Sequence, residues 1–233
     1  MLALHVFAPE MGMISPSPFS VKALLLLELS GMPFTRVPGD PRKAPRGKLP
    51  VLVDNGQAIP DSEAIRAHLA RAHGFDADAH LTTRQRAEAA AIRALVEEHL
   101  YWVLVHSRWI ERPAETRAAF FGRLPAPLRR PVFALVRRQV DRALQGQGTG
   151  RHAPGEIHAM GAEGLAALAT LLGDGPYLFG DRPSSIDTVI FGFLENVLAA
   201  TLDTPLRAAA AAHPGLVAYH RRLRTGIAAP LLP

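Results

Sequence analysis

Apolar and polar positions in the first third of the chain follow a period of two in some segments and a helical period in others. Alternation over a few residues favours strands, and longer helical periodicity favours helices. Ser17 followed by Pro18 is a typical helix start, because serine caps helix N-termini well and proline suits the first turn. The predicted segments are a strand at 2–7, a helix at 17–29, strands at 34–37, 51–53 and 57–59, and a helix at 61–73.

This order of strand, helix, strand, hairpin and helix predicts a compact α/β unit over residues 1–76. After a short polar linker near residues 74–81, the chain becomes rich in Ala, Leu, Arg and Glu, with helical periodicity and no candidate strand. Residues 82–233 are therefore predicted to form an all-helical domain. Its expected helices lie near 82–108, 113–121, 126–144, 154–172, 184–201 and 213–224.

Composition narrows the possible classes of protein. Hydrophobic residues make up 48% of the chain and charged residues 20%, a balance typical of a globular protein. No run of about 18 apolar residues occurs, so no membrane span is predicted. The chain has no cysteine, which excludes disulfides and cysteine nucleophiles and fits a cytoplasmic protein. The net charge of +5 does not by itself indicate nucleic acid binding, and the ten histidines show no ligand spacing, so no metal is predicted.

Four local motifs, in a fixed order, carry the candidate chemistry. They are Ser17-Pro18-Phe19-Ser20, Lys48-Leu49-Pro50-Val51, Asp61-Ser62 and Ser184-Ser185-Ile186-Asp187. As an ordered set they resemble the glutathione transferase superfamily. The second and third motifs look like the glutathione-binding half of that family, and residues 177–187 look like its C-terminal folding motif. Three further stretches are similar to the bacterial branch related to failed-axon-connections and metaxin proteins: residues 101–102 with 108–109, 148–152 and 213–219.

The resemblance implies a thioredoxin-like N-terminal domain followed by an all-helical domain, with glutathione bound as co-substrate and a homodimer as the assembly. It implies a cis Pro50 that turns the backbone of Val51 toward the cysteinyl part of glutathione. It also implies that Asp61 and Ser62 hold the γ-glutamyl end. Lys48 is placed to meet the glycyl carboxylate. Apart from the resemblance, Asp61 and Ser62 could be a capping pair and Lys48 a solvated loop residue.

A hydroxyl at a helix N-terminus can donate a hydrogen bond to the glutathione thiolate, which the helix dipole also favours. Ser17 is the preferred donor, with Ser20 and then Ser15 as alternatives, and a pure capping role for Ser17 remains open. Ser184 and Asp187 are interpreted as a structural capping box. The acceptor pocket is expected against the helix predicted at 82–108. Its candidate residues are Tyr101, Trp102, His106, Arg108 and Trp109.

Three functions compete at this point. The first is glutathione transfer to a hydrophobic electrophilic small molecule, with Ser17 stabilising the thiolate. The second is a non-catalytic binding or interaction module on the same fold. The third is a glutathione-dependent isomerase or lyase. A fold alone does not decide between them.

Overall fold

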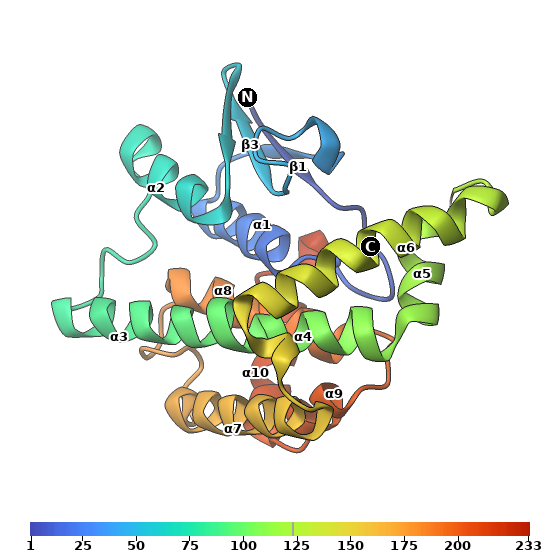
Figure 1. Cartoon of the computed structure of the whole chain (residues 1–233). Helices are drawn as coiled ribbons and strands as arrows, with labels where there is room; N and C mark the ends of the chain where they lie inside the picture. The colour runs from blue at the N-terminus through green and yellow to red at the C-terminus, as the bar shows by residue number, and fades with distance from the viewer. Residues whose placement is uncertain (123) are drawn as a thin grey trace.

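The computed structural model describes residues 1–122 and 124–233. The N-terminal domain is a mixed four-stranded sheet with strand order β2-β1-β3-β4, drawn at the top of Figure 1. β1 pairs with β2 in parallel and with β3 antiparallel, and β3 and β4 form an antiparallel hairpin. The strands are β1 Leu2–Val6, β2 Phe34–Pro38, β3 Val51–Asp54 and β4 Gln57–Pro60.

Two helices complete this domain, α1 Pro18–Ser30 and α2 Ser62–His73. Each ends at a glycine with positive φ, Gly31 at 65° and Gly74 at 68°, a backbone conformation that costs glycine little. The hairpin turn takes Asn55 and Gly56 through positive φ, as the Asn-Gly signal predicts. The predicted elements of residues 1–76 are therefore confirmed, with bounds that differ by one residue.

The C-terminal domain is helical. Its elements are α3 Thr83–Ala94, α4 Tyr101–His106, α5 Pro113–Phe121, α6 Ala126–Gln147, α7 Pro154–Leu172, α8 Ser185–Leu194, α9 Pro205–Ala211 and α10 Pro214–Thr225. The sequence pattern missed α9, because seven residues are too few to show a helical period. Three single-turn π-helical segments interrupt or extend these helices, at Leu95–Leu100, Ser107–Glu111 and Glu195–Ala199.

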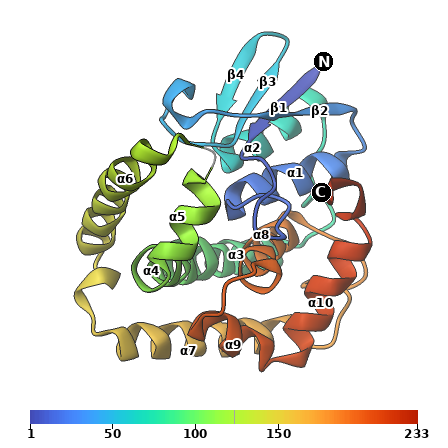
Figure 2. The same ribbon diagram turned by 90° about the vertical axis from the view of Figure 1, so that its right-hand side faces the viewer.

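Helix α8 joins the two domains in one core, since it packs against α1 and is buried along its whole length. Figure 2 shows α8 directly below α1, with α3 and α4 beside it. The approach is close at Gly192, where an added Cβ would lie 2.5 Å from the carbonyl oxygen of Pro18. The N-terminus of α1 is therefore fixed by the C-terminal domain.

The start of α8 confirms the predicted capping box. One carboxylate oxygen of Asp187 accepts hydrogen bonds from the Ser184 amide and hydroxyl, both at 2.8 Å. The other oxygen accepts from the Leu178 amide at 2.9 Å and from the Tyr219 hydroxyl at 2.8 Å. Because Asp187 is only 1% exposed, these four donors satisfy a buried carboxylate, and its role is structural.

Candidate functional site

Two of the three predicted glutathione-binding motifs lie side by side. The Leu49–Pro50 peptide bond is cis, as the resemblance implies. Val51, the first residue of β3, is paired with Pro60 at the end of β4. The chain then turns directly into α2, and the amide of Asp61 donates to the carbonyl of Pro50 at 3.2 Å. The cis-proline turn and the N-terminus of α2 therefore form one continuous edge.

The N-terminus of α2 has an unusual backbone. Asp61 has φ of +84°, in a region that non-glycine residues adopt at a cost of about 1–3 kcal/mol and that is common at functional sites. Its side chain is exposed and caps the helix, accepting from the Glu63 amide at 2.8 Å. Ser62 is buried, with 3% exposure. The predicted capping role of Asp61 is thus real, and it leaves the exposed carboxylate beside the helix N-terminus.

Lys48 lies two residues before Pro50 and is exposed. It precedes the same turn that carries Val51. Its ammonium group therefore belongs to a loop at the rim of this edge and not to the core.

The three candidate hydroxyls differ sharply in burial. Ser15 and Ser20 are fully buried; the Ser15 hydroxyl donates to the carbonyl of Phe7 at 3.1 Å, and the Ser20 hydroxyl has no partner among the described residues. Ser17 is only partly buried and caps α1, where its oxygen accepts from the Ser20 amide at 3.3 Å. Since accepting that bond leaves the Ser17 hydroxyl proton unused, Ser17 can still donate to a ligand at the surface.

The loop before Ser17 is held by buried side chains of the C-terminal domain. The Ile14 amide donates to Glu195 at 3.1 Å. The Ser15 carbonyl accepts from Asn196 at 3.1 Å, and the Pro16 carbonyl accepts from Arg108 at 2.9 Å. These three side chains come from π-helical segments, which are frequent at functional sites. The position of Ser17 is therefore set from both domains.

Arg108 corrects one expectation. It is expected in the acceptor pocket, but it is 5% exposed and its guanidinium donates to the backbone carbonyls of Pro16 and Asn196, so it holds the backbone before Ser17 in place. Burial lowers the pKa of Arg108 to about 10. This role, like those of Glu195 and Asn196, could not be predicted from the sequence, because a buried polar residue in a helix has the same local pattern as an exposed one.

The other acceptor candidates face different ways. Tyr101 packs edge to face on Phe19 of α1, with ring centroids 5.0 Å apart, and burial raises the pKa of its hydroxyl. Trp109 instead stacks on Phe133 of α6 at 6.0 Å. Trp102 is half-buried beside Tyr101, and His106 is buried. Tyr101 is therefore the candidate that lies at the contact between the domains.

A buried ion network lies behind the site. Lys22 of α1 has a side chain only 2% exposed, and its ammonium group contacts Glu63 of α2 at 3.2 Å and Glu97 at 2.8 Å. Arg93 of α3 also contacts Glu63, at 2.7 Å. Burial raises the pKa of Glu97. This network ties α1 and α2, whose N-termini carry Ser17 and Asp61, to the helical domain.

Among the described residues, hollows occur against α1 and within the helical domain. The hollow between α1 and the helical domain holds about 10 Å³, room for one water molecule. A groove of about 630 Å³ lies between α5 and α6 and is lined by arginine side chains, among them Arg117, Arg130 and Arg137. Among the described residues, no helix combines the length and hydropathy that a membrane span requires.

Family models agree with this architecture. A model described as glutathione S-transferase N-terminal domain matches residues 18–114, and one described as glutathione S-transferase, C-terminal domain matches residues 161–223. A glutathione S-transferase from Methylobacterium radiotolerans, solved with glutathione sulfonate, superposes with a TM-score of 0.62 at 22% identity, covering 100% of this chain and 94% of that one. This likeness shows the fold.

Three curated proteins are similar in sequence. Isoprene-epoxide–glutathione S-transferase of Rhodococcus sp. is 30% identical over 96% of this chain and 98% of its own length. Human metaxin-1 is 32% identical over 86% of this chain, and failed axon connections of Drosophila melanogaster is 29% identical over 88%. The chain spans only 45% and 52% of these last two proteins. With its two-domain fold, its cis-proline turn and a relative matched along its whole length, the chain belongs to the glutathione S-transferase superfamily, with metaxin-like relatives.

Proposed function

We propose that this protein binds glutathione along the edge formed by Pro50–Val51 and Asp61–Ser62, with its thiol at Ser17, and transfers it to a hydrophobic electrophilic small molecule. The observation that carries the proposal is the contrast among the three serines. Ser17 is the partly exposed one, and it lies at the N-terminus of a 13-residue helix with a hydroxyl proton to donate. A thiolate is favoured at such a position.

Two interactions are expected to lower the pKa of the glutathione thiol. A hydrogen bond to a charged group contributes about 1.5–3 kcal/mol, and the helix dipole about 0.3–1 kcal/mol. At 1.36 kcal/mol per pKa unit, these contributions would lower the pKa of the glutathione thiol from about 8.5 by roughly 1.3–3. A substantial thiolate fraction at neutral pH follows, and the thiolate is the nucleophilic form.

The remaining residues would hold the peptide. The backbone of Val51 would pair with the cysteinyl unit as an added strand does. The N-terminus of α2 at Ser62 suits the α-carboxylate of the γ-glutamyl end, and the exposed Asp61 carboxylate suits its ammonium group. Lys48, exposed at the rim, would meet the glycyl carboxylate.

The relative matched along its whole length is named for an epoxide, so a small apolar epoxide is the first acceptor to test. In that step the thiolate sulfur forms a bond to an epoxide carbon, and the carbon–oxygen bond breaks. The resulting alkoxide takes a proton from solvent. Tyr101, at the contact between the domains, is the residue expected nearest to the acceptor. A homodimer remains the expected assembly.

The test compares three variants of the full chain. Ser17→Ala should raise the pKa of bound glutathione, followed by thiolate ultraviolet absorption, by about 1–2 units and lower epoxide turnover at least tenfold. Ser20→Ala is the matched control, because that hydroxyl is buried and has no partner in the part of the chain that the structure describes, and it should change neither quantity. Asp61→Ala should weaken retention on immobilised glutathione. Equal thiol pKa values in the Ser17 and Ser20 variants would reject the role of Ser17.

The similarity to metaxin-1 supports a second candidate, a module that binds without turnover. It predicts glutathione retention that depends on Asp61 but no conversion of any electrophile. A chain that is retained and also consumes an epoxide would reject this candidate. Formation of a rearranged product with no net loss of glutathione would instead identify an isomerase.

A further inference from the structure

Three side chains with metal-binding donors converge at the end of the N-terminal domain away from the glutathione-binding edge. Asp54 ends β3, and His68 and His73 lie on the last two turns of α2. The Nε2 atoms of His68 and His73 lie 2.8 and 2.7 Å from the same carboxylate oxygen of Asp54. All three donor atoms lie within 4.8 Å of one another. The histidine spacing alone predicts no metal, because the third donor comes from a strand.

The geometry points to a divalent transition-metal site at Asp54, His68 and His73, with zinc as the ion that this donor set suits. Zinc is bound by histidine nitrogen at about 2.0–2.1 Å and by carboxylate oxygen at about 2.0–2.2 Å. Three protein donors with water in the fourth position are a common tetrahedral arrangement. Two imidazoles and one carboxylate provide that set here, and the ion would take the place of the contacts that the two Nε2 atoms now make with Asp54.

Little movement is needed to admit the ion. Tetrahedral donors around zinc lie about 3.3 Å apart, so each Nε2 atom would move away from the Asp54 oxygen by about half an ångström. The two Nε2 atoms, which lie within 4.8 Å of each other, would have to reach that same separation. The two rings meet at 69° and do not stack, which leaves the Nε2 atoms free to point at one centre. Ligation through Nε2 places the ring proton on Nδ1, and the Nδ1 atom of His68 has no hydrogen-bond partner among the described residues, so a water would have to accept from it.

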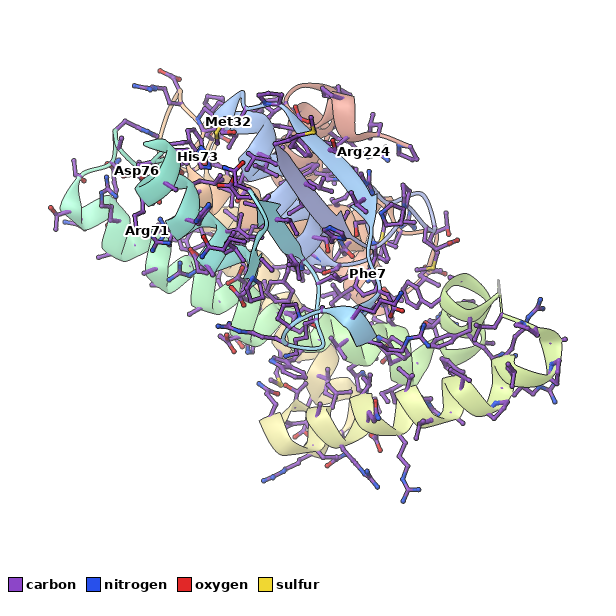
Figure 3. The ribbon with its side chains drawn as sticks, turned by 90° about the horizontal axis from the view of Figure 1, so that it is seen from above. Phe7, Met32, Arg71, His73, Asp76 and Arg224 are labelled. Carbon is purple, nitrogen blue, oxygen red and sulfur yellow. The ribbon has the colours of Figure 1, made fainter. Side chains whose placement is uncertain are left out.

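The surroundings also favour a cation. The side chains of Asp54 and His68 are 8% and 5% exposed, whereas that of His73 is 26% exposed and provides a path for the ion and a water ligand. Figure 3 shows His73 at the end of α2, close to the labelled Arg71 and Asp76. The carbonyl end of a helix dipole attracts positive charge. A cation held there would be partly shielded from solvent.

The site would join two elements at the ends opposite to their glutathione-binding residues. Asp54 is three residues from Val51, about 10 Å along β3. His73 is eleven residues from Ser62, about 16 Å along α2. A bound ion would therefore fix α2 on the sheet without contacting glutathione. Its role is that of a structural clamp, independent of the proposed transfer reaction.

The test is calorimetric titration of zinc chloride into the untagged full chain, stripped with chelator and free of glutathione, whose thiol would compete. We expect one ion per chain, and visible absorption bands typical of tetrahedral cobalt when Co²⁺ is used. His73→Gln should weaken zinc binding at least tenfold and abolish those bands. Because His73 is partly exposed, this variant should keep its fold, which circular dichroism checks.

Two control variants make the assignment specific. His152→Gln removes an exposed histidine that lies 3.7 Å from Glu156, and His158→Gln removes a histidine paired with Glu111. Both should bind zinc as the parent does. The inference is overturned if no saturable one-to-one binding occurs, if the His73 variant binds equally well, or if His158→Gln is the variant that loses the ion. In those cases Asp54 and the two histidines form a hydrogen-bonded cluster only.

Discussion

Replacing Glu63 by glutamine should reveal how strongly the buried ion network holds the proposed glutathione-binding edge together. Glu63 lies in the first turn of α2, one residue after Ser62, and its carboxylate contacts Lys22, Arg66 and Arg93. Glutamine keeps the size of the side chain and removes its charge. Lys22, whose side chain is 2% exposed, would keep only Glu97 as its counter-ion.

The magnitude follows from the acidity of Glu63. Burial pulls the pKa of Glu63 up, but Lys22, Arg66 and Arg93 outweigh it and hold the pKa at about 2, below the ordinary 4.5. A shift of about 2.5 units corresponds to roughly 3 kcal/mol. The side chain is 30% exposed, so solvent screening reduces this to about 2 kcal/mol. For a chain of this size, the melting temperature should fall by about 4–8 °C.

The lowered pKa of Glu63 determines how its contribution to stability changes with pH. A carboxyl whose pKa is lower in the folded state stabilises the fold above its unfolded pKa, and it loses that contribution as the pH falls toward the folded value. The difference in unfolding free energy between parent and Glu63→Gln should therefore be full at pH 7 and shrink between about pH 4.5 and 2.

Urea unfolding followed by circular dichroism at pH 7, 5, 4 and 3 measures this difference. Glu88→Gln is the control, because Glu88 forms an exposed pair with Arg84 and its loss should barely move the midpoint. A Glu63 variant as stable as the parent at pH 7 would refute the reasoning. So would a difference that stays constant down to pH 3.

Three other predictions concern the contacts that position α1 and α8. Gly192→Ala should lower the free energy of unfolding by about 1–3 kcal/mol in thermal unfolding, because the new Cβ would lie 2.5 Å from the Pro18 carbonyl oxygen. Gly155→Ala is the control and should leave stability unchanged, because nothing lies within 4 Å of its new Cβ. Asp187→Asn should lower the free energy of unfolding in urea by about 1–3 kcal/mol. The new amide NH₂ group would face the hydrogen-bond donors that surround the buried Asp187 carboxylate. Arg108→Met should lower glutathione affinity in calorimetry, because the Pro16 carbonyl loses its buried donor; unchanged affinity would show that this contact does not set the site.

Local signals were sufficient for most of the fold. Ser17 with Pro18, the Asn55–Gly56 turn and the Ser184–Asp187 capping box each act within a few residues, so the sequence displays them directly. Helix α9 was not predicted because its seven residues are too few to show a helical period. The π-helical segments were not predicted because they continue helices whose apolar pattern does not distinguish them.

The site was predictable only in part, for the same reason. The cis bond at Pro50 came from a resemblance, since most such bonds are trans. The preference for Ser17 over Ser20 and Ser15 follows from its place at the helix start, but the complete burial of the other two hydroxyls is not visible in the sequence. Lys22 lies in an apolar helical run, and nothing local indicates that its partners are 41 and 75 residues away.

The attachment of residues 14–16 to the helical domain has a consequence for evolution and engineering. The backbone before Ser17 is held by Arg108, Glu195 and Asn196, so the thioredoxin-like half cannot hold this backbone in place unaided. Exchanging either half with that of a distant relative would break these contacts even if each half folded normally. Substitutions in residues 14–16 and in the three side chains that hold them should therefore occur together in evolution. A chimera should keep its fold here only if Arg108, Glu195 and Asn196 are transferred together with residues 14–16.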